Sequence, residues 1–131
     1  MRQGIKSLLG PKLLLGIAIS YTLLITAALL TPITGAPKIE IPFADKIVHL
    51  IINAGLFVVW ASYVFSGKTK TTKTYTLPLL FVCTLLYGIL IEVVQGSFIP
   101  TRGADFFDVV ANVCGLILGF FAVKLTKKFI Y

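Results

Sequence analysis

Charged residues are scarce in this 131-residue chain, and their scarcity excludes most soluble folds. They make up 13% of the sequence, whereas soluble domains average about 25%. The chain has only five acidic residues and one histidine, so every group able to do acid–base or coordination chemistry can be placed individually. The two cysteines, Cys83 and Cys114, fall within apolar segments. We expect both to be small buried hydrophobes, with no disulfide between them.

Hydrophobic residues instead gather in long stretches without charge. The stretch after Lys12 has 25 uncharged residues and the one after His49 has 18, while a membrane-crossing helix needs roughly 17–25 apolar residues. We therefore predict an all-α fold, a polytopic bundle of four transmembrane helices at about 12–31, 46–66, 75–97 and 105–124. The short connections predict a single transmembrane domain over residues 1–131. The first apolar run exceeds the roughly 7–15 residues of a signal-peptide core, so we expect it to be retained.

The basic residues predict the orientation of the bundle. In this topology nine Lys and Arg residues lie on the side of the termini and three on the other side. Because excess Lys and Arg marks the cytoplasmic side, both termini are predicted to be cytoplasmic. The net charge of +7 is then a topology signal with some attraction to anionic lipids. Nucleic-acid binding is excluded as an explanation because no soluble basic module exists to carry it.

All five acids fall on the non-cytoplasmic half in this topology, and so do the histidine and several other polar residues. These residues are Glu40, Asp45, His49, Glu92, Gln95, Arg102, Asp105, Asp108 and Asn112. One membrane face thus receives plain lysines, and the other receives the groups suited to binding or catalysis. The sequence therefore predicts a functional site on the outer side.

Two of these polar groups have both a structural and a functional interpretation. Asp45 and His49 are four residues apart at the start of the second span, and Asn53 continues their helical face; Asp45 can be an N-cap or can orient the histidine. Glu92 lies one to two turns below the outer end of the third span, where a carboxylate is costly. It should face inward and pair with Arg102 or His49, or with a bound cation.

The fourth span carries a stripe of polar and small residues at helical spacing. Asp105 as N-cap and Asp108 at the third helical position would both stabilise the helix start. Asn112 is expected to form hydrogen bonds across helices. Gly115 and Gly119 form a small-x-x-x-small pair that lets helices approach closely. We expect Asn112 and the glycines to be structural, and Asp105 and Asp108 to belong to the outer site.

Together these motifs resemble the VanZ-like family of small bacterial membrane proteins. The resemblance covers residues 45 to 123 and rests on Asp45-Lys46-x-x-His49, Glu92-x-x-Gln95 and Pro100-x-Arg102-x-x-Asp105-x-x-Asp108-x-x-x-Asn112-x-x-Gly115-x-x-x-Gly119. Asn53 departs from the pattern, since an apolar or aromatic residue is expected there. The resemblance implies a multi-pass protein of the bacterial cytoplasmic membrane and a link to teicoplanin resistance, but no reaction.

Two classes of function fit the sequence. In the first, the outer polar pocket binds membrane lipid headgroups, a lipid-linked cell-wall precursor or a lipoglycopeptide, with Arg102 holding an anionic group. In the second, the chain is an intramembrane hydrolase or transferase with His49 as general base, and Ser97 and Thr101 are the available hydroxyl groups. A divalent metal on His49 with Glu92 or Asp108 is a variant, but a single histidine is a weak signal. No metal or cofactor is therefore predicted, and nothing predicts the oligomeric state.

Overall fold

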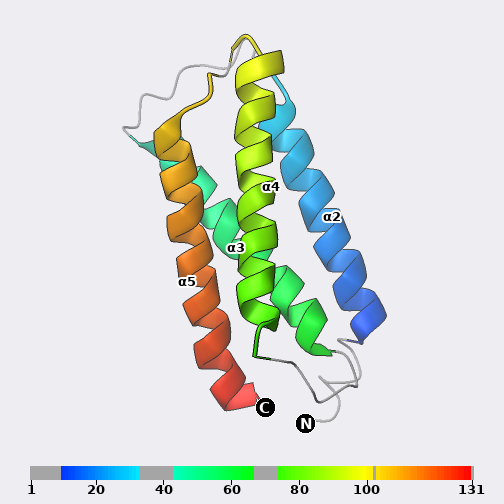
Figure 1. Cartoon of the computed structure of the whole chain (residues 1–131). Helices are drawn as coiled ribbons and strands as arrows, with labels where there is room; N and C mark the ends of the chain where they lie inside the picture. Colours follow the sequence, from blue (N-terminus) through cyan, green and yellow to red (C-terminus); the bar gives the residue numbers. More distant parts are fainter. Residues whose placement is uncertain (1–9, 33–42, 67–73, 102, 131) are drawn as a thin grey trace.

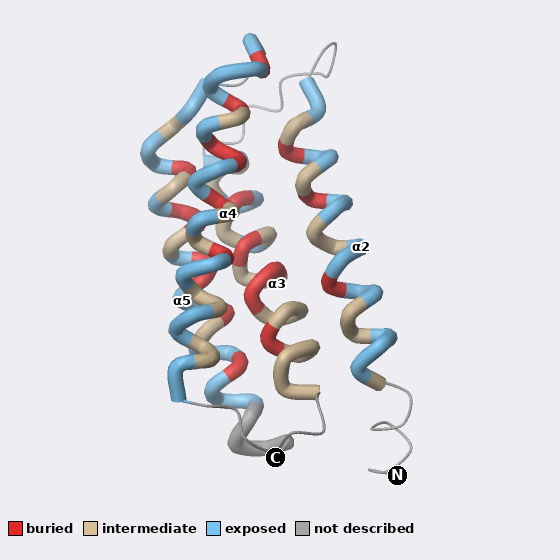
Figure 2. The backbone as a smooth tube through the Cα atoms, turned by 45° about the vertical axis from the view of Figure 1, so that its right-hand side comes forward, coloured by how far each residue is buried: buried red, intermediate tan, exposed pale blue. Residues whose placement is uncertain are grey.

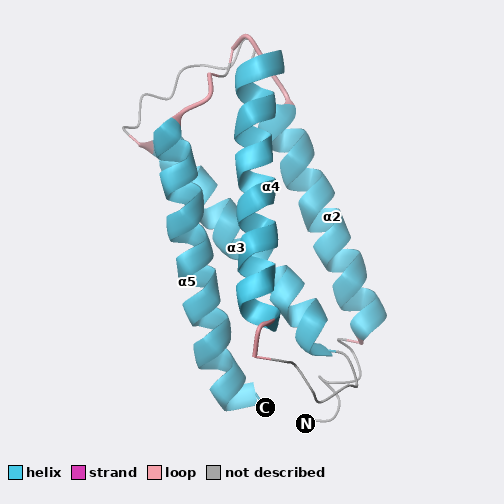
Figure 3. Ribbon diagram, in the orientation of Figure 1, coloured by secondary structure: helices cyan, strands magenta, loops and turns pink. Residues whose placement is uncertain are grey.

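The chain folds into a bundle of long helices. The computed structural model describes residues 10–32, 43–66, 74–101 and 103–130, without the side chains of residues 127–130. Its helices are α2 (Pro11–Leu30), α3 (Ala44–Ser66), α4 (Thr76–Phe98) and α5 (Phe106–Ile130). Figures 1 and 3 show them running up and down in turn, and no strand occurs in the described ranges. All four are long and apolar enough to cross a membrane, which confirms the predicted fold class.

Prolines explain where several of these helices begin and end. Pro11 is the first residue of α2, a position where its missing N–H removes no hydrogen bond. Pro78 lies in the first turn of α4, where it is tolerated for the same reason. Ile99 ends α4 in an extended conformation, as expected for a residue before Pro100. The helices start and stop within two residues of the predicted spans, except that α5 continues to Ile130.

The contact between α3 and α5 is the most extensive in the bundle. Gly115 of α5 lies against the backbone carbonyl of Leu50, so closely that a Cβ would clash with it. One turn further, a Cβ on Gly119 would come 2.9 Å from the carbonyl oxygen of Ala54. The two glycines therefore let the α3 and α5 backbones approach each other closely. This contact sets how the two helices are aligned along their axes, and so which polar side chains of α3 and α5 lie opposite each other.

Apolar side chains fill the interior of the bundle around the second half of α3 and also cover its outer surface. Phe57, Ala61, Leu116 and Val123 form the buried core cluster, and Figure 2 shows the buried positions of each helix turned toward its neighbours. Large hydrophobic residues remain exposed on the outer helix faces, as in a bundle surrounded by lipid. Cys83 and Cys114 are also exposed and unpaired. The expectation that they are buried is wrong, because the outer face of a membrane helix is as apolar as its core.

Helix α2 is attached to the bundle by side-chain hydrogen bonds. The Tyr21 hydroxyl donates to the carbonyl of Ile52 at 2.9 Å, and the Trp60 indole donates to the Thr22 hydroxyl at 3.0 Å. These bonds satisfy polar groups that lipid could not. Helix α2 therefore supports α3 from the side opposite α5.

Candidate functional site

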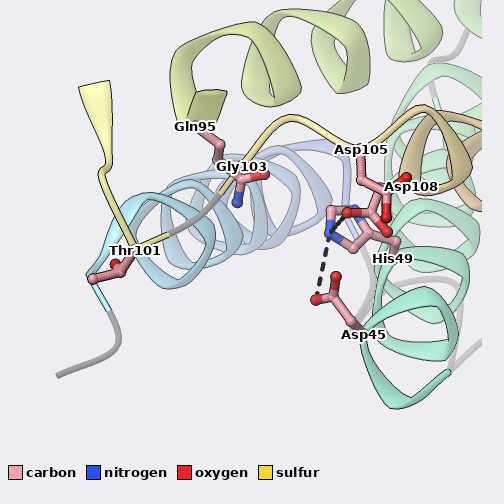
Figure 4. Close-up of a pocket in the computed structure, with 7 residues that line it drawn as sticks. All are labelled: Asp45, His49, Gln95, Thr101, Gly103, Asp105 and Asp108. Atoms are coloured by element: carbon pink, nitrogen blue, oxygen red, sulfur yellow. Dashed lines mark ion pairs between the residues drawn. The ribbon is translucent and has the colours of Figure 1, made fainter. Parts of the chain in front are cut away.

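Polar side chains gather where three helix ends meet. The start of α3, the end of α4 and the start of α5 lie at the same end of the bundle, away from the start of α2 and the end of α5 (Figure 1). A pocket with a volume of about 380 Å³ opens there. Its lining consists of Asp45, His49, Gln95, Thr101, Gly103, Asp105 and Asp108. Figure 4 shows the three aspartates gathered around His49, with Gln95, Thr101 and Gly103 across from them.

Asp105 caps α5 and pairs with α3 at the same time. Its Oδ1 accepts the N–H of Phe107 at 2.8 Å, and its backbone carbonyl accepts the N–H of Asp108 at 3.1 Å, which is the geometry of an N-cap. Its Oδ2 accepts a hydrogen bond from Lys46 Nζ at 2.6 Å. These bonds hold the pKa of Asp105 below its usual value, the Lys46 contact having the larger effect and the Phe107 amide the smaller.

Lys46 is the cation at the centre of the aspartates, and the site prediction from sequence missed it. Its ammonium lies 2.6 Å from Asp105 Oδ2, 2.7 Å from Asp108 Oδ1 and 3.9 Å from Asp45 Oδ2. In the sequence Lys46 is a basic residue of the outer side and part of the motif Asp45-Lys46-x-x-His49, but it is not among the predicted site residues. The available signal was its spacing, because Lys46 precedes His49 by three residues and so shares its helical face.

A chain of buried amides fixes the orientation of His49. The side-chain nitrogen of Asn53 donates to the His49 carbonyl at 2.9 Å and to Asn112 Oδ1 at 2.7 Å. The carbonyl can only accept, so the Asn53 amide has one orientation, and this in turn fixes Asn112 with its oxygen toward Asn53. The same Asn112 oxygen lies 3.1 Å from His49 Nδ1. Nδ1 must therefore carry a proton and donate it.

It follows that the neutral His49 ring presents an unprotonated Nε2. This atom lies 3.9 Å from Asp45 Oδ1 and 3.8 Å from Asp108 Oδ2, too far for a hydrogen bond with either. The ring itself is 1% exposed and lines the pocket. A buried imidazole lone pair between two carboxylates can accept a proton or bind a cation.

Glu92 approaches the same histidine from α4. Its Oε1 lies 3.3 Å from His49 Nδ1, and its side chain is almost completely buried. Neither of its oxygens has a hydrogen-bond partner among the described residues. The alternative partner expected from the sequence, Arg102, lies outside the described residues. Glu92 is thus a buried carboxylate that approaches the same ring nitrogen as Asn112.

The remaining predicted residues lie at the margin of the site or below it. Gln95 lines the pocket but donates its amide to the carbonyl of Leu29 at 2.6 Å. Gly88 lies beside the amide pair, since a Cβ there would come 3.1 Å from the Asn112 nitrogen. Gly115 and Gly119 lie deeper, against the α3 backbone. Of the two interpretations of Asp45, the N-cap is wrong, because Asp45 lies inside the first turn of α3; its carboxylate is directed toward His49.

The site offers one arrangement suited to a cation. Asp45, His49 and Asp108 each offer one ligand atom, and these atoms lie within 4.8 Å of one another; in the described ranges no other group of three or more His, Cys, Asp or Glu residues does this. The described residues supply carboxylates and an imidazole at the pocket, with Lys46 beside them. The chemistry at hand is therefore proton acceptance, hydrogen bonding to donor groups and cation binding.

Comparisons with known proteins identify the family of this chain and one relative. A family model described as VanZ/LLP1 matches residues 12–127, which includes every site residue above. An uncharacterized protein of Schizosaccharomyces pombe is 34% identical over 102 residues, covering 78% of this chain and 58% of that protein. The chain thus spans somewhat more than half the length of this relative. No solved structure matches the chain.

Proposed function

Because this chain belongs to the VanZ/LLP1 family, we propose that its pocket binds the polar headgroup of an amphipathic cell-envelope molecule. The main support is that acidic side chains line the pocket and exposed apolar side chains surround it at the same helix ends. The pocket is lined by Asp45, His49, Asp105 and Asp108, while large aromatic rings at those helix ends are exposed. These rings belong to Phe43, Phe98, Phe106 and Phe107, which are 66–79% exposed.

The exposed rings support an amphipathic ligand over a water-soluble one. Phe43 directly precedes α3, Phe98 is the last residue of α4, and Phe106 and Phe107 begin α5. In a membrane these positions lie at the ends of the spans, where phenylalanine rings, which have no polar group, would contact acyl chains next to the pocket. A lipid-anchored molecule would leave its chains against these rings while its headgroup entered the pocket.

The charges of the described residues favour a headgroup rich in hydrogen-bond donors. The aspartates and the Nε2 lone pair are acceptors, and the single ammonium of Lys46 is already shared between Asp105 and Asp108. Hydroxyl and amino groups of sugars and amino acids fit such a lining. These groups occur in lipid-linked cell-wall precursors and in lipoglycopeptides such as teicoplanin, which is the ligand class we propose. Arg102 is assigned to any anionic part of the ligand.

The location proposed for this function is the outer side of the bacterial cytoplasmic membrane. The excess of Lys and Arg on the side of the termini supports this orientation, since the pocket lies at the other end of the bundle. The relative in fission yeast means that family membership alone does not fix a bacterial origin. The proposed bacterial location therefore depends on the proposed ligand class, the bacterial cell-wall precursors and the lipoglycopeptides.

A binding experiment tests the proposal directly. The purified protein in nanodiscs is titrated with a polyprenyl-linked cell-wall precursor, with teicoplanin and with an anionic phospholipid. We expect one of the first two to bind, and Asp45→Asn to weaken binding at least about tenfold, because it removes a charged acceptor from the pocket lining. Asp45 is exposed and makes no hydrogen bond among the described residues, so the fold should persist. Lys124→Gln, at the other end of the bundle, is the matched control and should bind normally. Absence of binding by the wild type would overturn the proposal.

One observation supports a second candidate, an intramembrane hydrolase or transferase. The unprotonated Nε2 of His49 faces the pocket, and the exposed Thr101 lines the same pocket, so a base and a hydroxyl group share one space. His49→Gln should then abolish product formation from the bound precursor while leaving its binding measurable. If the wild type releases no product from a bound ligand, the binding function stands and the enzyme is excluded.

A further inference from the structure

The geometry points to a divalent-cation site formed by His49 Nε2, Asp45 Oδ1 and Asp108 Oδ2. The sequence does not favour a metal, since it contains one histidine and no Cys/His pair. The structure adds what the spacing could not show. It brings one imidazole and two carboxylates from α3 and α5 to the same wall of the pocket.

The first argument is the tautomer of His49. Metal ions bind the unprotonated imidazole nitrogen, while the other ring nitrogen usually donates its proton to a carbonyl or carboxylate. The amides of Asn53 and Asn112 impose this state on the neutral ring, with the proton on Nδ1. Nε2 is thereby held as a ligand atom inside a buried side chain, and no described residue lies within hydrogen-bond distance of it.

The second argument is the orientation of the Asp108 carboxylate. Lys46 takes Oδ1 at 2.7 Å, which leaves Oδ2 turned toward His49 Nε2 at 3.8 Å. Asp45 Oδ1 lies at a similar distance, 3.9 Å. Metal–ligand bonds of about 2.0–2.2 Å separate tetrahedral ligands by about 3.3–3.6 Å. The three ligand atoms lie within 4.8 Å of one another, so movement of the exposed Asp45 side chain would complete the site.

The third argument is the surplus of negative charge and the unsatisfied Glu92. Among the described residues four carboxylates, those of Asp45, Glu92, Asp105 and Asp108, surround one ammonium and one imidazole. Burying charge without a partner is costly, and both Glu92 oxygens lack a hydrogen bond. Metal binding at Nε2 makes Nδ1–H a stronger donor. Glu92, 3.3 Å from Nδ1, is placed to stabilise that state.

The ligand set indicates the kind of ion. One imidazole with two carboxylates suits Zn²⁺ or Mn²⁺, whereas Mg²⁺ and Ca²⁺ prefer oxygen alone. Three protein ligands leave at least one position open to the pocket. An oxygen of the bound headgroup would occupy it, a role that rests on the ligand-binding function proposed above, whereas the cation site itself does not.

The test is metal binding to the purified protein with no organic ligand present. After treatment with a chelator, the protein in detergent is titrated with ZnCl2 by calorimetry and with MnCl2 by electron paramagnetic resonance. We expect about one ion per chain and a concentration-dependent rise in Tm. The same ligand titration with and without chelator keeps the two proposals separate. If the protein binds metal but no organic ligand, only the proposed ligand-binding function is refuted. If it binds the organic ligand but no metal, only the cation site is refuted.

Two variants provide the comparison. Asp45→Asn removes one proposed ligand that makes no hydrogen bond among the described residues, so the fold should persist and metal affinity should fall at least about tenfold. Lys124→Gln also changes the charge by one unit, but near the end of α5, away from the pocket, and should retain the affinity. Equal affinity in both variants, or no ion bound by the wild type, would overturn the site.

Discussion

Lys46 and Asp108 join α3 to α5, with Nζ 2.7 Å from Oδ1, at the only end of that interface where charge is buried among the described residues. Below them the same two helices touch through glycines and apolar side chains. The pair therefore connects α3 to α5 at the polar end of their interface. Its removal should lower the stability of the fold and disturb the geometry of the site.

Lys46→Met should destabilise the protein. The change keeps an unbranched side chain one atom shorter but leaves the buried Asp108 without its hydrogen-bond donor, and a buried polar group without its partner costs about 1–3 kcal/mol. We expect a lower Tm in detergent, measured by intrinsic fluorescence. Lys46→Arg, which keeps the charge, should retain most of the stability. An unchanged Tm in Lys46→Met would show that the pair contributes nothing.

Acid should weaken the contact between Lys46 and Asp105. The hydrogen bonds from Lys46 and from the Phe107 amide lower the pKa of Asp105, so the ionised carboxylate is favoured in the folded state. The resulting stability is complete above the ordinary pKa of about 3.9 and is lost as the pH falls through the lower folded value. Tm of the wild type should therefore drop below about pH 4 more steeply than Tm of Asp105→Asn. Parallel Tm profiles would contradict the assignment.

Gly115→Ala should separate α3 from α5. The added Cβ would clash with the backbone carbonyl of Leu50, and overpacking of this kind costs about 1–3 kcal/mol. Gly16→Ala in α2 is the matched control, because nothing lies within 4 Å of a Cβ there, and it should be neutral or slightly stabilising. Thermal unfolding of both variants measures the difference. Equal Tm values would mean that the close approach is not needed.

The tautomer of His49 can be observed directly. It is the only histidine of the chain, so ¹⁵N labelling of histidine gives one pair of ring signals. We expect a protonated Nδ1, because Asn112 Oδ1 can only accept from it, and hence an unprotonated Nε2 in the neutral ring. Asn112→Leu removes that acceptor and should allow the other tautomer. A proton on Nε2 in the wild type would also remove the basis of the cation site.

The orientation of the bundle is checked by labelling introduced cysteines in intact cells. Lys38→Cys should react with an impermeant reagent and Lys70→Cys should not, since the first lies on the predicted outer side and the second on the cytoplasmic side. Cys83 and Cys114 are exposed on the helices and must first be replaced by alanine. Labelling of both positions from the same side would reverse or refute the topology.

The sequence predicts the helices and the polar end of the bundle well because both depend on local patterns. Uncharged runs mark the spans, and an aspartate before an apolar run marks the start of α5 at Asp105. Local patterns do not predict which side chains of different helices contact each other. The i, i+3 spacing places Lys46 beside His49, but it cannot show that α5 rather than lipid or water faces them. The sequence therefore places Lys46 in the motif before His49 but does not predict that it pairs with the aspartates of α5.

Asn53 shows the same limit from the other direction. In the sequence it departs from the family pattern, and an amide deep in a span has no local explanation. The structure supplies one, because Asn53 connects the His49 carbonyl to Asn112 across the helix interface. Buried amides form hydrogen bonds with whatever lies opposite them, so their meaning depends on which helices pack together, and that depends on contacts distant in sequence.

Gln95 has a consequence for what the pocket can accept. The Leu29 carbonyl that it binds is among the last four of α2, which have no partner within their own helix. The hydrogen bond uses one N–H of the Gln95 amide, while the second N–H and Oε1 are not used by it. Helix α2 thus holds Gln95 in one orientation at the pocket, where a ligand can meet both a donor and an acceptor without breaking the bond to Leu29.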